Sequence, residues 1–376
     1  MKKIAIAVAA AMTAGAACAA DVTVYGIVDT GFGYTNENTL NAPTDSKFEM
    51  INGFNSGSRF GFKGTEDLGN GYAVSFILEN GFASDTGALG QNSRMFGREA
   101  QLKMHTPYGT LSFGRAGTLL SGAGSLEVFG TFADTLPGGW DGIFNVANYQ
   151  GNGMRLDNMV TYQTPTAAGF TGYAQYSFAN DTTKGDSDSV DNTRDTNRYT
   201  AFGLTYANGP VNAVVIYDTV MYKHVGSNDI GAQRDIGDNR NLTVGGSYDF
   251  GFARVSAYGQ YVKGARSGYG IDLWLDTPDD SRYDDADGYN FHLGAKFPLP
   301  CGRLFVAGYY GKLELNEADD DDLTNWNVMV AHEYDLSKRT LVYSGISYRQ
   351  VKRENDDVKN IDTKTTQVVV GLRHVF

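Results

Sequence analysis

The side chains that most often carry catalysis or bind metals are few and scattered in this sequence. The five histidines, at positions 105, 224, 292, 332 and 374, do not show the spacing of a metal site. The motifs of serine hydrolases, zinc proteases, nucleotide-binding loops and paired cysteines do not occur. The sequence therefore predicts no catalytic residues, no cofactor and no enzymatic activity.

An acidic stretch, DSRYDDADG at 280–288, has the composition of a calcium-binding loop. An EF-hand loop aligned on Gly288 would need an aspartate where the chain has Tyr283 and a glutamate where it has Gly294. We therefore expect no EF-hand and assign no metal ligands. The acidic runs at 279–287 and 319–322 are predicted to be solvated loops, and loosely held divalent cations are the alternative.

Charged residues at alternate positions of apolar runs are the residues most able to do chemistry here. Alternate residues of a β-strand lie on one face, so these charges would share one side of a sheet. Such a wall can form structural ion pairs, or it can line an aqueous passage that selects solutes by charge and width. The basic candidates are Arg59, Lys63, Lys103, Arg155, Arg254, Lys296, Arg349 and Arg373, and the acidic ones are Asp29, Glu79, Glu99, Asp157, Asp218 and Glu333.

The elements that carry these charges are runs of about ten residues with a period of two. No helical period is sustained, and 47 glycines with 23 tyrosines and 21 phenylalanines favour strands over helices. Seven connections are short and eight are long and polar, so the chain divides into about sixteen strands. The short connections are 67–71, 106–109, 164–169, 208–210, 249–251, 298–302 and 335–339, and the long ones are 36–47, 83–92, 118–154, 181–197, 224–238, 266–287, 316–324 and 353–362.

The sorting of connections by length has a physical explanation. In a bilayer every backbone N–H and C=O must be hydrogen-bonded within the protein, so strands can cross only as a closed barrel. A tilted strand of about 9–11 residues spans the membrane, with short periplasmic turns at one end and long loops at the other. We therefore predict one sixteen-stranded antiparallel transmembrane β-barrel over residues 21–376. A soluble β-sandwich is the alternative, but its turns would not sort by length.

The first twenty residues have the layout of a signal peptide for export. A basic start at 2–3 precedes an apolar run over 4–17, and small residues lead to the expected cleavage after Ala20 or Ala19. A membrane anchor helix is the alternative, although the run is short for one. Lipoprotein processing at Cys18 is a weaker alternative, because the residue three positions earlier is a glycine.

The chain after residue 20 is acidic, with 29 basic and 43 acidic residues. This balance argues against a nucleic-acid partner, which requires a basic surface. Cys301 is the single cysteine of that part, so no intrachain disulfide is expected. No apolar run after residue 20 approaches the length of a membrane-spanning helix.

The chain ends on Phe376, directly after an alternating run. Termini of soluble domains usually fray into water, so an aromatic final residue needs an environment that holds it. We expect the last strand to pair with the one that begins near Asp21 and to close the barrel. Phe376 would then lie in the aromatic girdle on the periplasmic side.

Several segments resemble the general Gram-negative porins of the beta-proteobacterial and neisserial type. The segment SGSRFGFKGTEDLGNGYAVSFILENGF at 56–82 is the most specific of them. Similar segments follow in the family's order from 21–31 to the C-terminal GLRHVF, so the resemblance covers essentially the whole chain after residue 20. It implies a homotrimer of sixteen-stranded, water-filled channels in outer-membrane lipid and lipopolysaccharide. It also implies that Phe376 belongs to a signal read by the barrel-assembly machinery.

The resemblance further implies a third loop that folds into the barrel and narrows it, and residues 118–154 fit this role. The segment carries leucines, phenylalanines and a tryptophan among many glycines, whereas the other long connections are polar. Such a loop needs a surface to pack on, and the barrel interior offers one. An external loop packed on a neighbouring subunit is the alternative.

A constriction of this kind would place acidic groups of the loop opposite basic groups of the wall. Where the family has a basic residue in the strand after the loop, this chain has Thr161. This difference leaves the positive side of the constriction unassigned at that position. The pore and constriction residues that we predict are Arg59, Lys63, Lys103, Glu127, Asp134, Asp141 and Arg155.

The function that follows is a passive diffusion channel of the outer membrane for ions and small hydrophilic solutes. The alternative is a non-conducting outer-membrane barrel that serves as an adhesin or a structural anchor. A conductance recording across a planar bilayer separates the two, because a plugged barrel gives no steady current.

Overall fold

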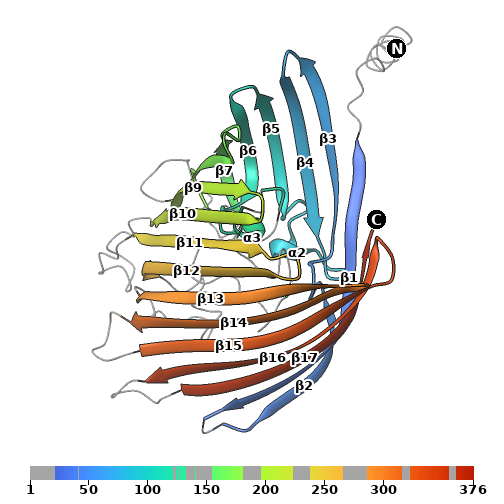
Figure 1. The fold of residues 1–376 in the computed structure, drawn as a ribbon, viewed down its shortest axis with the longest axis vertical. Coiled ribbons are helices and arrows are strands. Elements are labelled where there is room, and N and C mark those ends of the chain that lie inside the picture. The colour runs from blue at the N-terminus through green and yellow to red at the C-terminus, as the bar shows by residue number, and fades with distance from the viewer. Residues whose placement is uncertain are drawn as a thin grey trace, which may run out of the picture.

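All strands of the described part of the chain belong to one 17-stranded antiparallel sheet (Figure 1). The computed structural model describes residues 22–40, 42–121, 124–126, 128–132, 140, 155–180, 196–222, 238–265, 286–315, 322–354 and 361–376. The strands are β1 Thr23–Thr39, β2 Asp45–Asn52, β3 Arg59–Gly69, β4 Tyr72–Gly81, β5 Glu99–Thr106, β6 Gly109–Gly117, β7 Arg155–Gln163, β8 Phe170–Ser177, β9 Arg198–Asn208, β10 Val211–Met221, β11 Asn239–Asp249, β12 Arg254–Ala265, β13 Ala286–Leu299, β14 Gly302–Leu315, β15 Asp322–Asp335, β16 Thr340–Glu354 and β17 Ile361–Val375.

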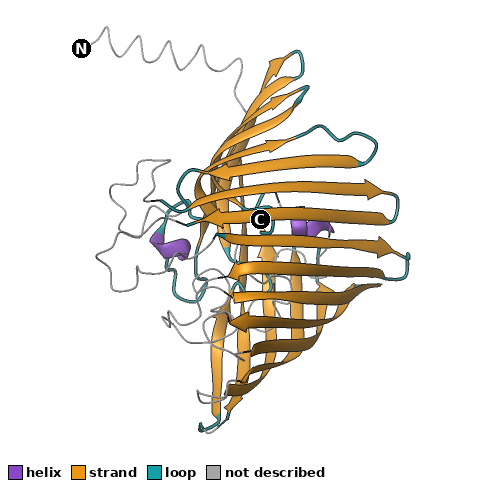
Figure 2. Cartoon of the chain, turned by 90° about the vertical axis from the view of Figure 1, so that its left-hand side faces the viewer, coloured by secondary structure: helices purple, strands orange, loops and turns teal. Residues whose placement is uncertain are grey.

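The sheet closes on itself between the first strand and the last. β1 pairs with β17 from Ile27 opposite Val375 to Thr39 opposite Thr363. Successive strands lie side by side around the rest of the wall (Figure 2). β2 and β3 each pair with a different half of β1 and together occupy one position in the wall. The wall therefore has sixteen strand positions, which confirms the predicted barrel.

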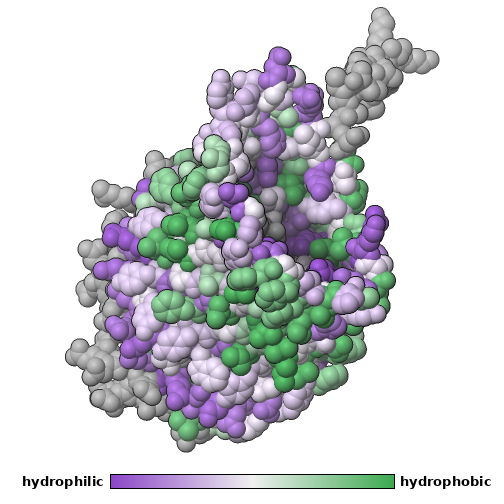
Figure 3. All heavy atoms as spheres, in the orientation of Figure 1, coloured by the Kyte–Doolittle hydropathy of each residue, from purple (hydrophilic) through white to green (hydrophobic). Residues whose placement is uncertain are grey.

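The two faces of the wall follow the alternation in the sequence. On β15, Val328 and Val330 are about half exposed on the outside, whereas Met329 and Ala331 between them are 2% exposed inside. Hydrophobic side chains accordingly gather in patches on the outer surface (Figure 3). Polar residues such as Asn325 and Asn327 face the interior instead. This arrangement suits a barrel with lipid outside and a polar lumen inside.

The seven short connections lie between strands as predicted. In the β3–β4 turn, Asn70 and Gly71 have φ values of 56° and 81°, a left-handed backbone that these residue types tolerate best. The β13–β14 turn holds Cys301, which is exposed and not in a disulfide. All seven connections lie at the same rim of the barrel, because each joins an odd-numbered strand to the even-numbered strand after it in an antiparallel wall.

The connection predicted over 36–47 is wrong in its length. β1 continues to Thr39 and β2 begins at Asp45, so most of this polar stretch is paired strand. Cross-strand polar contacts support it, including a hydrogen bond from Asn36 Nδ2 to Ser46 Oγ of 2.7 Å. Polar composition predicted a loop because strand ends that project beyond the membrane are solvated on both faces.

Two apolar clusters lie inside the barrel and include described residues of the 118–154 segment. In one, Leu119, Leu120 and Phe129 pack with Tyr199 and Ile216 of the wall. The short helix α3 (Val128–Phe132) lies against β10 and β11. In the other cluster, Trp140 packs with Phe54, Phe305 and Tyr343.

A second short turn of helix, α2 (Gly90–Ser93), lies next to β4 in the connection between β4 and β5. Within the described residues, no helix is both long enough and apolar enough to cross a membrane.

Candidate functional site

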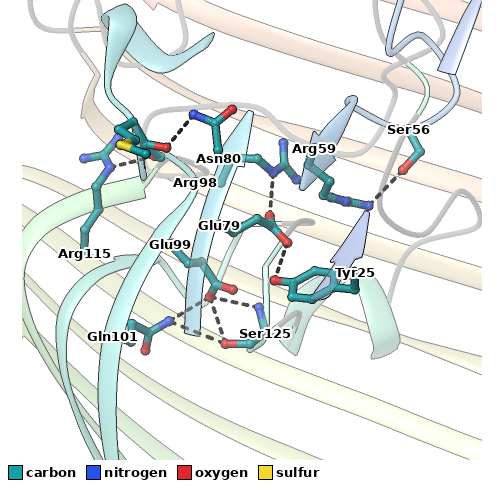
Figure 4. Close-up of polar contacts among 12 residues, drawn as sticks. Tyr25, Ser56, Arg59, Glu79, Asn80, Arg98, Glu99, Gln101, Arg115 and Ser125 are labelled. Atoms are coloured by element: carbon teal, nitrogen blue, oxygen red, sulfur yellow. Dashed lines mark hydrogen bonds and ion pairs between the residues drawn. The ribbon is translucent and has the colours of Figure 1, made fainter. Parts of the chain in front are cut away.

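A cluster of charged side chains lies on the inner wall where β1, β3, β4 and β5 meet (Figure 4). Glu79 of β4 is its first centre. Arg98 Nε lies 2.5 Å from Glu79 Oε1, and the Tyr25 hydroxyl donates to Glu79 Oε2 at 2.9 Å. Both members of this ion pair are largely buried, so the carboxylate and the guanidinium hold each other in fixed positions.

Glu99, which is opposite Glu79 in the β4–β5 ladder, connects the wall to the 118–154 segment. Its Oε1 accepts hydrogen bonds from the backbone N and the hydroxyl of Ser125, at 2.9 and 2.8 Å. Gln101 Nε2 donates to the same oxygen at 2.7 Å, and Lys103 Nζ donates to Ser125 Oγ at 2.6 Å. Three successive inward side chains of β5 therefore attach to one point of the segment, and Figure 4 shows two of them, Glu99 and Gln101, beside Ser125.

Asp157 of β7 is the third centre. Arg94 binds it in a bidentate manner, with N–O distances of 2.5 and 2.9 Å, and Arg115 binds Oδ1 at 2.7 Å. Arg115 also donates from Nε to the carbonyl of Gly97 at 2.7 Å. Nearby, Asn80 Nδ2 donates to the carbonyl of Met95. These bonds tie the β4–β5 connection to β6 and β7.

Arg59 and Arg155 complete the cluster. Arg59 NH2 donates to Ser56 Oγ at 3.0 Å (Figure 4). Arg155 lies within electrostatic range of Arg59, Arg98, Glu79 and Glu99. Its Nε makes no hydrogen bond to any residue in the described ranges. Several cations held close to one another make this part of the wall attract anions.

The balance of charge in this cluster is positive. It contains six basic side chains and three carboxylates, a formal excess of three positive charges, although the whole chain is acidic. Its members are Arg59, Arg94, Arg98, Lys103, Arg115 and Arg155 with Glu79, Glu99 and Asp157. We call this set the basic cluster.

The adjoining part of the inner wall, from β1 to β17, β16 and β15, has its own polar network. The Tyr343 hydroxyl donates to Asp29 Oδ1 at 2.8 Å. Asn55 donates to Glu333 Oε1 at 2.8 Å and accepts from Arg373 NH1 at 2.7 Å. Six carboxylates assigned to the inner face from the sequence are indeed buried there: Asp29, Glu79, Glu99, Asp157, Asp218 and Glu333.

The structure brings some predicted site residues together and separates others. Arg59, Lys103 and Arg155 belong to the basic cluster, whereas Lys63 is exposed, with its Nζ 5.0 Å from the centre of the Tyr25 ring. The three acidic residues of the loop, Glu127, Asp134 and Asp141, lie outside the described residues.

Sequence reasoning missed Tyr25, Arg94, Arg98 and Arg115. Arg94 and Arg98 lie in a connection, where strand alternation assigns no side. Arg115 lies at a register shift between Gly114 and Ala116, which breaks the alternation of β6. Tyr25 was recognised only as a strand residue. Arg98 directly precedes the inward Glu99, so strand alternation would place it on the outer face instead.

No group of three or more histidine, cysteine, aspartate or glutamate side chains in the described ranges is arranged to hold a metal ion. The basic cluster offers guanidinium and ammonium groups around an interior surface. Such groups can attract and orient anions by electrostatic interactions.

Comparison with known proteins identifies the family and agrees with the fold. A family model described as Gram-negative porin matches residues 5–356. The chain belongs to the Gram-negative porin family. An outer membrane porin of Bordetella pertussis is 35% identical over 98% of both chains, and outer membrane porin protein 32 of Delftia acidovorans is 30% identical over 100% of both. The chain is thus a passive channel of a Gram-negative outer membrane for ions and small hydrophilic solutes.

Solved structures agree with this assignment. An anion-selective porin from Comamonas acidovorans superposes with a TM-score of 0.69 at 25% identity, covering 95% of this chain and 100% of that one. The trimer form of OmpT, an outer membrane protein of Vibrio cholerae, has a TM-score of 0.59 at 18% identity, covering 95% of this chain and 100% of that one, and shares the fold.

Proposed function

We propose that this channel favours small anions over cations, and that the basic cluster is the wall that sets this preference. The observation that carries the proposal is the excess of basic side chains over carboxylates in the cluster, inside a barrel whose chain is acidic overall. Fixed charges on the wall of a narrow aqueous passage select ions by sign. The similarity to the anion-selective porin of Comamonas acidovorans supports the same sign.

The other side of the constriction, in this proposal, is the 118–154 segment folded into the barrel. Three described attachments support an inward path. Ser125 is hydrogen-bonded to Glu99, Phe129 stacks edge-on against Tyr258 at 5.0 Å, and Trp140 N donates to the Asn55 carbonyl at 2.9 Å. Glu127, Asp134 and Asp141 would then lie opposite basic side chains of the wall and produce a transverse field. Hydrated ions and dipolar solutes pass such a field more readily than apolar solutes do.

The proposed assembly is a homotrimer in outer-membrane lipid and lipopolysaccharide, inserted by the barrel-assembly machinery. The trimer form of the Vibrio cholerae protein, which shares the fold, supports this assembly. Here, outward side chains of β1 and β2 such as Phe32, Phe48 and Met50 are exposed and apolar, as a lipid-facing or subunit-facing wall requires. Residues 1–20 are proposed to be removed on export. No catalytic step is assigned to the chain.

The test is a planar-bilayer recording with a salt gradient across the membrane. The purified trimer should give steady single-channel conductance. Its reversal potential should have the sign expected when anions cross the channel more readily than cations. A reversal potential of the opposite sign would contradict the anion preference while leaving the channel in place. The absence of steady conductance would support the alternative of a non-conducting adhesin or anchor.

A further inference from the structure

The second strand position of the barrel wall is interrupted, and the interruption lies inside the barrel. Along β1, Ile27 pairs with Arg59 and Thr30 pairs with Asn52. The two pairs are thus three residues apart along β1 but seven residues apart along the neighbouring strand position, so four extra residues have no place in the ladder. We call residues Gly53–Ser58 the luminal segment. An ordinary bulge inserts one extra residue, so this excursion is a separate element of the fold.

The luminal segment is buried against the inner faces of strands that are distant along the chain. Phe54 packs with Phe305 and Tyr343 of β14 and β16. Asn55 is hydrogen-bonded to Glu333 of β15 and Arg373 of β17, as described above. Because the segment starts and ends beside β1, it reaches across the inside of the wall over at least three neighbouring strands.

Asp29 of β1 holds this excursion in place. Its backbone carbonyl accepts from Gly53 N at 2.9 Å and from Ser58 Oγ at 3.1 Å. Its carboxylate accepts from Ser56 N at 2.7 Å and from the Tyr343 hydroxyl at 2.8 Å. Asp29 itself is fully buried, and these bonds replace the ladder that β1 lacks at this point.

Two inward residues rest on the luminal segment. Trp140 N donates to the Asn55 carbonyl, and the Trp140 ring lies edge-on to Tyr343 at 5.5 Å and to Phe54 at 6.3 Å. Trp140 has a φ of 55°, which a bulky residue adopts only where its surroundings enforce it. At the other end, Ser56 Oγ accepts from Arg59 of the basic cluster.

We propose that the luminal segment is a second, fixed constriction element that positions Trp140 and Arg59, with Asp29 as the residue that anchors it. This inference rests on the proposed function, since a constriction matters only in a conducting barrel. A solute that passes through the pore then meets the basic cluster and Trp140. The luminal segment orients Arg59 of that cluster and also supports Trp140. Asp29 acts on ion flow through these residues and need not touch the solute.

The test compares two tyrosines of one apolar cluster. Tyr343→Phe removes the hydroxyl that binds Asp29 and keeps the ring beside Trp140, while Tyr309→Phe makes the same chemical change without altering those bonds. In single-channel recordings we expect Tyr343→Phe and Ser56→Ala to raise open-channel current noise by about twofold and to reduce anion preference, because the loosened arginine no longer holds its place at the wall. Tyr309→Phe should match wild type.

Trp140→Ala supplies the second measurement. It should raise both conductance and noise, and adding Tyr343→Phe to it should give little further noise, since both changes release the same support. Conducting Tyr343→Phe, Ser56→Ala and Trp140→Ala channels that match Tyr309→Phe in noise and reversal potential would overturn the inference. A wild-type barrel with no steady conductance would instead overturn the proposed function itself.

Discussion

Five of the six cations in the basic cluster are arginines, and the geometry shows why this residue type suits the site. A guanidinium stays charged when partly buried, and its planar fork can hold a carboxylate while further N–H groups face elsewhere. Arg94 uses two nitrogens on Asp157, and Arg115 divides its nitrogens between Asp157 and a backbone carbonyl. Cations fixed in this way present charge to the lumen at a defined place.

The first prediction tests the position of charge on β3. Arg59→Glu should shift the reversal potential toward cation preference, because it changes the formal charge of the basic cluster by two. Lys63→Glu makes the same change of charge on the same strand, but Lys63 is exposed and outside the cluster, so the shift should be smaller. Both are measured in a salt gradient across a planar bilayer. Equal shifts from the two variants would show that the cluster has no special role.

The second prediction concerns the shared carboxylate of β7. Asp157→Asn removes the carboxylate that two largely buried arginines share, so the free energy of unfolding should fall by about 2–4 kcal/mol. Anion preference should rise in the same variant, because one negative charge leaves the wall. Urea unfolding of the barrel in lipid vesicles measures the stability, and the reversal potential measures the selectivity.

Asp335→Asn is the control for that experiment. Asp335 pairs with Arg303 at 2.9 Å, but both side chains are over a third exposed, so the loss should stay below about 1 kcal/mol. A loss at Asp335 as large as that at Asp157 would contradict the view that burial makes the inner pair important.

At the scale of elements, the alternation of residues between two faces predicts the strand faces, the short turns and the number of wall positions. It does so because one face must meet lipid and the other the lumen. The luminal segment could not be predicted, because NGFNSGS is equally compatible with a strand end, a turn or a loop. Arg94 and Arg98 were missed for a related reason. The side chain of a residue in a connection is positioned by the carboxylate that it binds, and no local sequence pattern identifies that carboxylate.

The third prediction compares two outward residues of β15 that should lie at different depths in the membrane. Val328→Arg puts a charge on the lipid face in the middle of the strand and should reduce folding stability in bilayers by about 2–4 kcal/mol. Tyr334→Arg puts the same side chain on the same face next to the β15–β16 turn, where the cost should be about 0–1 kcal/mol. Unfolding titrations in vesicles compare the two, and equal losses would argue that this face does not meet hydrocarbon.

At the scale of the whole molecule, one seam converts a long sheet into a barrel. Gly26 and Phe376 exchange backbone hydrogen bonds of 3.1 and 3.0 Å, which extends the β1–β17 ladder to the last residue. The ring of Phe376 covers Gly26 so closely that a Cβ there would overlap the Cζ atom of the ring. A closed wall has no free edge strand, and the terminal aromatic covers the glycine at the point of closure.

The fourth prediction separates packing at this seam from recognition of the terminal residue during assembly. Phe376→Ser should lower the amount of heat-modifiable trimer in the outer membrane, because the ring is lost. Gly26→Ala keeps the terminal phenylalanine but displaces its ring and crowds the backbone carbonyl of Arg59 on β3, so it should weaken the purified barrel toward heat while leaving membrane insertion nearly normal. Gel electrophoresis of samples heated to a series of temperatures measures both the amount of trimer and its heat stability. Normal levels of trimer from Phe376→Ser would remove any special role for the last residue.

The exposed thiol of the β13–β14 turn gives the barrel a built-in marker of its orientation. Because all the short turns share one rim, a single label on Cys301 reports the side on which that whole rim lies. A bulky, membrane-impermeant maleimide added to intact cells should leave Cys301 unmodified, and the same reagent should react once the periplasm is opened. Reconstituted channels could likewise be sorted by insertion direction through one chemical modification, without engineering a residue.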